Sequence, residues 1–252
     1  MQNDHALQPR SALEPSATAY TLIAHRGDAT QHVENTLAAF VSAARLGLRY
    51  VELDVQVTRD GVPIVLHDVS LARIHRIAKR VTLLSIDELT ALGVLAGGKR
   101  PPPIPTLSEF TAWMRATPTI RVFVEIKKES LAVHGRKHVL AAIAAAIESV
   151  RDRVVIISYD ARVLAMAKRA GFPIGYVLPS MHARHQATAE KLEPEWLFAD
   201  HQQILESGAV WPGSWNWAAF EIDNIDLAQH LSRLGVAYIE TMNPAKLMRV
   251  AH

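Results

Sequence analysis

Several features are missing from this chain of 252 residues, and each absence narrows the chemistry available to it. It contains no cysteine, so disulfide bonds and thiolate metal sites are excluded. No segment approaches the roughly 20 consecutive apolar residues of a membrane-spanning helix, so stable membrane insertion is not expected. The formal net charge of +2 is too small to indicate nucleic-acid binding through bulk electrostatics.

The beginning of the chain also lacks a recognisable signal. Residues 1–19 are mostly polar or small, contain Asp4 and Glu14, and have no apolar signal-peptide core. We expect them to form a flexible tail on a cytoplasmic protein, followed by one domain over residues 20–252. Hydrophobic residues make up 49% of the chain and charged residues 21%, a globular balance that allows a large core.

Apolar, β-rich runs alternate with helical patterns along the rest of the sequence. The strands are predicted at residues 21–25, 50–57, 120–127, 154–158, 174–178, 196–199, 219–223 and 238–241. The helices are predicted at residues 36–46, 107–116, 137–150, 161–170 and 226–234. Gly47, Gly171 and Gly235 follow three of these helices, as C-terminal caps do. Alternation with short connections predicts an α/β fold with a parallel sheet, and eight such strands predict a (β/α)8 TIM-like barrel.

One stretch interrupts the alternation. Asp60-Gly61 is a strong hairpin signal, and a parallel strand could not return within so few residues. The strand at 50–57 is therefore expected to pass the barrel rim, turn, and run back through residues 64–66, which returns His67 to the rim. We interpret residues 69–105, which are rich in basic side chains, as a short insertion over the same face.

Polar side chains with catalytic chemistry stand at the ends of three predicted strands. His25 ends the first, Glu52 and Asp54 lie two residues apart on the second, and Glu125 and Lys127 lie two residues apart on the third. Side chains two apart on a strand leave the same face. Because barrel active sites lie at the C-terminal ends of the strands, we expect these groups to converge.

The residue types indicate metal-assisted phosphoryl transfer. The carboxylates Glu52, Asp54 and Glu125, without cysteine, favour an oxygen-preferring divalent cation, Ca²⁺ or Mg²⁺. Arg26 and Lys127 are expected to bind the phosphate charge of a small-molecule phosphodiester. Two histidines, one accepting a proton and the other donating one to the leaving alkoxide, complete the predicted site.

Each of these residues alone is better explained as a structural polar group at a strand end, and only their convergence favours function. Four other histidines lie in basic, surface-like stretches, namely His75, His134, His182 and His185. We expect their side chains to be solvated. Asn35 and Thr36 are expected to cap the first helix, although Glu34 and Asn35 also lie near the phosphate side of the rim.

A tryptophan-rich stretch, residues 211–217, stands on the loop before a late strand and has two readings. It is either a hydrophobic plug over the edge of the barrel or an aromatic wall for the substrate alcohol. The sequence does not choose between them.

The ordered motifs resemble the glycerophosphodiester phosphodiesterase family over about residues 21 to 250. The motifs are His25-Arg26-Gly27, Glu34-Asn35-Thr36, Glu52-x-Asp54, Thr58-x-Asp60-Gly61, His67-Asp68, Ile104-Pro105-Thr106-Leu107 and Glu125-Ile126-Lys127. The resemblance implies a TIM-like barrel that uses a divalent cation to hydrolyse glycerophosphodiesters to glycerol phosphate and an alcohol. It also implies that His25 and His67 are the acid–base pair, that Glu52, Asp54 and Glu125 are metal ligands, and that Arg26 and Lys127 contact phosphate.

The sequence departs from the family pattern at three places. Val33 replaces the usual proline before Glu-Asn-Thr. Phe220-Glu221-Ile222-Asp223 replaces Trp-Thr-Val-Asn and adds acidic groups near the expected pocket. The closing Thr-Asp is Thr241-Met242, with an additional acid at Glu240 on the same strand face as Met242. These changes leave the predicted catalytic residues in place and bear on the identity of the alcohol.

Two alternatives to hydrolysis remain open from the residues. The same barrel could support a phospholipase D-like or cyclising lyase reaction on lysolipids, in which an adjacent hydroxyl attacks phosphorus and gives a cyclic phosphate. A non-catalytic phosphate-ligand binder on an enzyme scaffold is the alternative of a different class, and the intact acid–base and metal residues argue against it. The sequence predicts no particular oligomeric state.

Overall fold

A computed structural model describes residues 20–95 and 102–248 of the chain. The tail predicted at residues 1–19 lies outside the described residues, as do residues 96–101 of the predicted insertion. Within the described ranges, none of the helices is both long enough and apolar enough to span a membrane.

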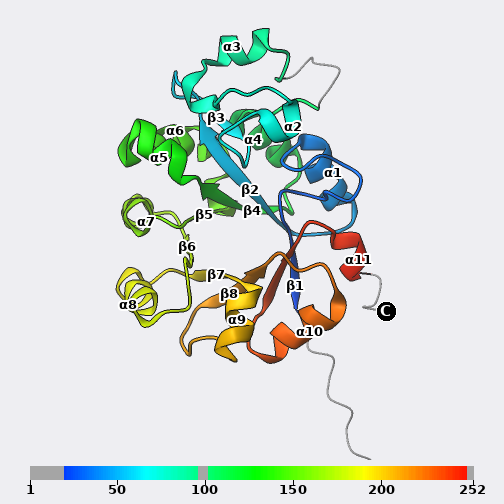
Figure 1. The fold of residues 1–252 in the computed structure, drawn as a ribbon, viewed down its shortest axis with the longest axis vertical. Helices are drawn as coiled ribbons and strands as arrows, with labels where there is room; N and C mark the ends of the chain where they lie inside the picture. The colour runs from blue at the N-terminus through cyan, green and yellow to red at the C-terminus, as the bar shows by residue number, and fades with distance from the viewer. Residues whose placement is uncertain (1–19, 96–101, 249–252) are drawn as a thin grey trace, which may run out of the picture.

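Nine strands of the described chain form a single sheet that closes on itself (Figure 1). All neighbouring pairs are parallel except β2 with β3, and β1 closes the barrel by pairing with both β9 and β2. The predicted (β/α)8 barrel is confirmed. The strands are β1 (Thr21–Ala24), β2 (Tyr50–Val57), β3 (Pro63–Val65), β4 (Arg121–Ile126), β5 (Val154–Ser158), β6 (Ile174–Val177), β7 (Trp196–Asp200), β8 (Asn216–Phe220) and β9 (Tyr238–Thr241).

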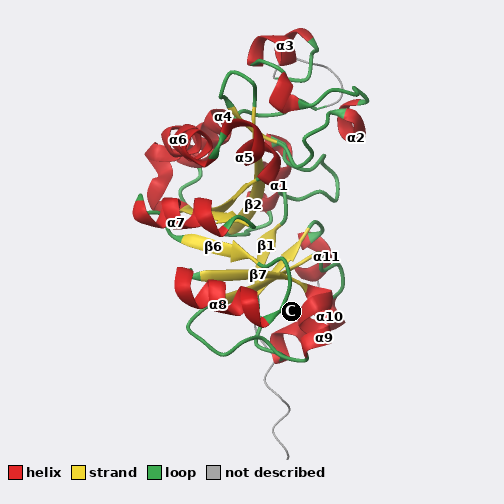
Figure 2. Ribbon diagram, turned by 60° about the vertical axis from the view of Figure 1, so that its left-hand side comes forward, coloured by secondary structure: helices red, strands yellow, loops and turns green. Residues whose placement is uncertain are grey.

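Helices surround the barrel and connect its successive strands (Figure 2). Most of the connecting helices begin with a side-chain cap: Thr36 caps the first of them, and Thr106 forms a reciprocal capping box with Glu109 on a later one. The α-helices are α1 (Leu37–Arg45), α2 (Ala72–His75), α3 (Ile86–Ala91), α4 (Leu107–Ala116), α5 (Lys128–His134), α6 (Arg136–Ile147), α7 (Ala161–Arg169), α8 (Ala183–Leu192), α9 (His201–Ser207), α10 (Ile225–Arg233) and α11 (Pro244–Met248), with 3₁₀ helices η1 (Val81–Leu83) and η2 (Glu148–Arg153).

Aromatic side chains fill the barrel below the polar residues of β2 and β4. Tyr50 and Phe123 stand two positions before Glu52 and Glu125, on the same strand faces, and their rings stack with centroids 6.0 Å apart. The ring of Trp196 meets that of Tyr238 edge to face, with a centroid separation of 4.4 Å. This apolar floor fills the barrel interior at the end opposite the C-terminal ends of the strands.

The predicted hairpin is present between β2 and β3. Val55 pairs with Val65 and Val57 with Pro63 in antiparallel register, and Gly61 donates to the Thr58 carbonyl at 2.9 Å across the turn. The backbone N–H of Leu66 then donates to the carbonyl of Asp54 at 2.9 Å, which returns the chain to the rim. His67 therefore lies beside β2, as the short turn predicts.

Between β3 and α4 the chain forms α2, η1 and α3 around a small hydrophobic cluster of its own. Its buried members are Ile64, Leu66, Leu71, Val81, Leu84, Leu89, Val94 and Ile104. Figure 1 shows α3 at the top of the view, beyond the ring of helices that surrounds the barrel. We propose that this lobe is the insertion expected at about residues 69–105, and that the barrel with the lobe constitutes one domain over residues 20–252.

Two local predictions are wrong. The late strand predicted at residues 219–223 is β8 at Asn216–Phe220, because Glu221 adopts a left-handed conformation (φ 64°) that ends the strand. His75 is buried, with 6% of its surface exposed, rather than solvated. It occupies the last position of α2, inside the lobe.

Candidate active site

A pocket of about 550 Å³ opens at the C-terminal ends of the barrel strands. One part of its wall is charged and the other is apolar. The charged part contains His25, Arg26, Glu52, His67, Glu125, Lys127 and Glu240, and the apolar part contains Ile157, Tyr159, Val177, Pro179, Phe198 and Phe220. The pocket thus gathers six of the seven predicted site residues, and the seventh, Asp54, is fully buried behind Arg26 and Lys127.

The turn after β1 positions Arg26 through an unusual backbone conformation. Arg26 (φ 57°) and Gly27 (φ 83°) both adopt positive φ, and a Cβ on Gly27 would lie 2.7 Å from Cβ of Ala39. Glycine is therefore required where the turn touches α1. The backbone N–H of Arg26 donates to Glu52 Oε2 at 3.2 Å, which ties the turn to β2.

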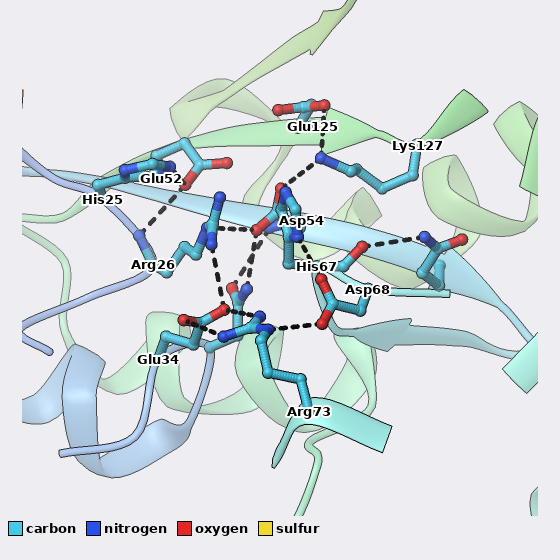
Figure 3. A network of polar contacts seen from close by, with 12 residues as sticks. His25, Arg26, Glu34, Glu52, Asp54, His67, Asp68, Arg73, Glu125 and Lys127 are labelled. Carbon is cyan, nitrogen blue, oxygen red and sulfur yellow. Dashed lines mark hydrogen bonds and ion pairs between the residues drawn. The ribbon is translucent and has the colours of Figure 1, made fainter. Parts of the chain in front are cut away.

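Asp54 is the centre of the polar network (Figure 3). Its Oδ2 lies 3.0 Å from Arg26 Nε and accepts from Asn35 Nδ2 at 2.8 Å, and its Oδ1 lies 3.0 Å from Lys127 Nζ. Lys127 Nζ also lies 2.9 Å from Glu125 Oε1. The two cations therefore hold carboxylates from β2 and β4 in fixed positions.

The protonation of these groups follows from burial and charge. Burial and the charge of Arg26 lower the pKa of His25 to about 3, so its imidazole is neutral at pH 7. Burial would raise the pKa of Asp54, but Lys127 and Arg26 hold that pKa below its ordinary range. Burial and the charge of the nearby Asp54 raise the pKa of Glu52 well above its ordinary value.

His67 is held by a neighbouring carboxylate at the mouth of the pocket. Its Nδ1 lies 2.7 Å from Asp68 Oδ1, which leaves Nε2 available for proton transfer. Arg73, on α2, donates through Nε to Asp68 Oδ2 at 2.6 Å and through both terminal nitrogens to Glu34. Glu34 in turn accepts from Arg26 at 3.1 Å. One arginine of the lobe thereby binds the two carboxylates that hold His67 and Arg26.

The predicted metal ligands fit a hard divalent cation. Glu52, Asp54 and Glu125 each offer an oxygen, and these atoms all lie within 4.8 Å of one another. The Oε1 atom of Glu52 is buried without a hydrogen-bond partner in the described residues, so it is free to bind an ion. Oxygen donors of this kind suit Ca²⁺ or Mg²⁺.

Two residues of the site, Asn35 and Arg73, make contacts that the sequence does not predict. Asn35 was expected to cap α1 with Thr36, but only Thr36 does so, and Asn35 binds Asp54 instead. Its positive φ of 57° turns it towards β2. Arg73 stands six residues after His67, and nothing in its local sequence distinguishes it from the other basic residues of the lobe.

The tryptophan-rich loop does not belong to this pocket. It precedes β8 and therefore lies at the N-terminal end of that strand, opposite the site. Trp217 is buried, its ring meets that of Trp211 edge to face, and its Nε1 donates to the Trp211 carbonyl at 3.2 Å. This packing favours the reading as a hydrophobic plug, and none of the residues of the loop lines the pocket described above. Of the later departures from the family pattern, Phe220, Glu221 and Glu240 line the pocket.

The chain is similar to proteins of known family. The model of the glycerophosphoryl diester phosphodiesterase family matches residues 25–208, well over half of the chain. A probable glycerophosphodiester phosphodiesterase 2 of Mycobacterium tuberculosis is 38% identical over 109 residues, which cover 43% of this chain and 39% of that protein. A glycerophosphodiester phosphodiesterase of Caldanaerobacter subterraneus is 44% identical over 94 residues, covering 35% of this chain and 37% of that protein. The matched segments thus span less than half the length of these curated relatives.

Solved structures share the fold over almost the whole chain. A phosphodiesterase of Oleispira antarctica, in complex with the product sn-glycerol-3-phosphate, has a TM-score of 0.78 at 23% identity and covers 91% of this chain and 95% of its own. A glycerophosphodiester phosphodiesterase of Parabacteroides distasonis has a TM-score of 0.79 at 18% identity, covering 92% of this chain and 96% of its own. At these identities the likeness establishes the barrel fold.

Proposed function

Because the chain belongs to the glycerophosphoryl diester phosphodiesterase family, we propose that it hydrolyses glycerophosphodiesters to glycerol phosphate and an alcohol, with the help of a divalent cation. One observation carries the proposal: two histidines, two cationic side chains and a buried carboxylate cluster converge on one pocket at the mouth of the barrel. The relatives named as glycerophosphodiester phosphodiesterases, and the neighbour bound to sn-glycerol-3-phosphate, support this substrate class.

Arg26 and Lys127 bind the phosphate in this proposal. Both side chains line the pocket, and both are fixed by carboxylates, so their charges do not have to be ordered when the substrate arrives. Glu34 and Asp54 hold the Arg26 guanidinium, and Asp54 and Glu125 hold the Lys127 ammonium. Pre-ordered cations stabilise the charge that the phosphoryl oxygens carry in the transition state.

Glu52, Asp54 and Glu125 would hold the divalent cation, either Ca²⁺ or Mg²⁺. When bound there, the cation would supply charge that neutralises the phosphoryl oxygens and makes the phosphorus more susceptible to attack. The buried, unpartnered Oε1 of Glu52 supports this assignment.

The two histidines divide the proton transfers. We assign His25, which is buried and neutral, as the group that accepts a proton from the attacking water. The water oxygen forms a bond to phosphorus while the bond from phosphorus to the alcohol oxygen breaks. His67, oriented by Asp68 at the mouth of the pocket, gives a proton to the departing alkoxide. The apolar wall that includes Tyr159, Phe198 and Phe220 is where we place the alcohol.

A screen of glycerophospho-alcohols, with and without added divalent cation, tests the function. The products are followed by phosphorus NMR. We expect glycerol phosphate as the phosphorus-containing product, loss of turnover after exhaustive chelation, and recovery with Ca²⁺ or Mg²⁺. A cyclic phosphate as the final product would show that the protein catalyses the cyclising lyase reaction instead of hydrolysis. Ligand binding without turnover of any substrate would make the protein a phosphate-ligand binder.

A further inference from the structure

Glu240, on β9, is a buried acid that the proposed mechanism does not use. It pairs in register with Ile23 of β1, lines the pocket, and has 3% of its surface exposed. No residue in the described ranges donates a hydrogen bond to its carboxylate or forms an ion pair with it, and its Oε1 is fully enclosed. A buried carboxyl group without a hydrogen-bond donor or a cation is costly, and a bound ion would compensate that cost.

Two neighbours of Glu240 also carry a buried polar atom that has no hydrogen-bond partner in the described residues. One donor atom from each of His25, Glu52 and Glu240 lies within 4.8 Å of the other two. Glu52 Oε1 and His25 Nδ1 are also buried without a hydrogen-bond partner in the part of the chain that the structure describes. Three neighbouring side chains thus each carry a buried polar atom without a partner in the described ranges, and one of them, Glu52, also belongs to the proposed cation site.

The cationic side chains of the site are engaged elsewhere. Arg26 is paired with Glu34 and Asp54, and Lys127 with Asp54 and Glu125. Neither lies within ion-pair distance of Glu52 or Glu240, and Glu52 receives only one backbone N–H, from Arg26. Among the described residues, Arg26 and Lys127 therefore leave Glu52 and Glu240 without a cationic ion-pair partner.

We propose that Glu240 is a ligand of the divalent cation, next to Glu52, so that this chain holds the ion with four carboxylates and prefers Ca²⁺ to Mg²⁺. The inference rests on the proposed function, in which Glu52, Asp54 and Glu125 bind a divalent cation. Glu52 belongs to both groups of neighbouring donors, so one ion beside Glu52 can be reached from either side.

The selectivity follows from the size of the two ions. Ca²⁺ accepts six to eight oxygen ligands at about 2.3–2.6 Å, so two ligands on opposite sides of it are about 5 Å apart. The donors in each group lie within 4.8 Å of one another, so one ion can contact all three donors of a group. Mg²⁺ requires a tighter octahedron at about 2.0–2.1 Å and keeps several of its waters, so an additional carboxylate is of less use to it.

Cation titration by calorimetry tests the inference on the full chain after chelator treatment. Glu240→Gln keeps the shape of the side chain and removes its charge. The matched control is Glu221→Gln, which changes an exposed carboxylate at the pocket rim that belongs to neither donor group. We expect Glu240→Gln to weaken Ca²⁺ binding at least tenfold and Mg²⁺ binding less, while Glu221→Gln stays within about twofold of the wild type. Ca²⁺ affinity of Glu240→Gln within twofold of the wild type would overturn the inference.

Thermal unfolding gives a second measurement that does not depend on activity. Without cation, Glu240→Gln should unfold at the same temperature as the wild type or higher, because the Glu240 carboxyl group has no partner in the described residues that the substitution would remove. Saturating Ca²⁺ should raise the wild-type Tm by more than it raises the variant's. Equal increases would also overturn the inference. If the wild type binds neither ion and still turns over substrate after chelation, the proposed cation dependence fails as well. If the wild type binds the ion and Glu240→Gln binds it equally well, only the role of Glu240 is removed.

Discussion

Asp68 joins His67 to Arg73. The Oδ1 of Asp68 lies 2.7 Å from Nδ1 of the His67 imidazole, and its Oδ2 accepts from Nε of Arg73 at 2.6 Å. The terminal nitrogens of Arg73 bind Glu34, which also binds Arg26. A single side chain from α2 thus supports a proposed catalytic histidine and a proposed phosphate ligand, and this connection leads to the first prediction.

Arg73→Ala should reduce kcat/KM about 10- to 100-fold, the usual effect of removing a group that orients a ligand-binding or catalytic side chain. Because Arg73 positions His67, the loss should appear mainly in kcat, and the pH profile should change with it. Lys79→Ala, an exposed basic residue of the same lobe, is the control and should keep wild-type kinetics. A loss explained wholly by reduced folded fraction would make Arg73 a structural residue only.

His25→Ala and His67→Ala should each lose activity on the order of 10²–10⁴-fold. Both act on one reaction coordinate, so the double variant should be far less than multiplicatively worse. A substrate with a p-nitrophenolate leaving group needs no protonation and should rescue His67→Ala but not His25→Ala. Equal rescue of both variants, or of neither, contradicts the assignment of acid and base.

Lys127→Ala should lower catalytic efficiency by one to two decades, since a charge-assisted contact is worth about 1.5–3 kcal/mol. Its unfolding should stay cooperative, as measured by urea denaturation. Lys128→Ala is the matched control, because Lys128 also lines the pocket but has no ion-pair partner within the described ranges. Unchanged kinetics, or a chain that no longer folds, would show that Lys127 has only a structural role, in which its ammonium group holds Asp54 and Glu125 together.

Gly27→Ala should destabilise the fold by about 2–4 kcal/mol, because it adds backbone strain to a clash with α1. The new Cβ would lie 2.7 Å from Ala39 Cβ and 2.8 Å from the Ala39 carbonyl carbon. Gly61→Ala separates the two effects: its φ of 86° is similar, but nothing lies within 4 Å of the added Cβ, so only about 1–2 kcal/mol of strain is expected. Equal losses of unfolding free energy in the two variants would show that Ala39 yields to the new methyl group.

Acid should weaken the contact between α6 and α7. Burial alone would raise the pKa of Asp160, but hydrogen bonds from Arg136 and from the N-terminal backbone of α7 hold it below its ordinary value of 3.8. The unfolded chain then binds more protons, so the stabilisation is fully present above about pH 4 and is lost as pH falls below it. Asp160→Asn, which keeps the cap, should be less stable than wild type at pH 7, and the difference should shrink towards pH 3. A difference that stays constant with pH would assign the effect to packing.

The sequence by itself determined the barrel and most of the site. Strand and helix periodicities are local, so they predicted the parallel alternation, and Asp60-Gly61 predicted the hairpin that brings His67 back to the rim. Glu52 and Asp54, like Glu125 and Lys127, share a strand face whatever the rest of the fold does. Since parallel strands end at one rim, convergence of these groups followed from the same pattern.

Tertiary structure alone decided which distant groups compensate one another. Arg73 meets Glu34 across 39 positions of sequence, and Glu240 meets Glu52 only because β9 and β2 both flank β1 in the closed barrel. The side of the barrel on which the Trp211 loop lies depends on strand direction, and the burial of His75 depends on packing within the lobe. These relationships depend on closure of the barrel and on long-range packing, so local side-chain preferences cannot predict them.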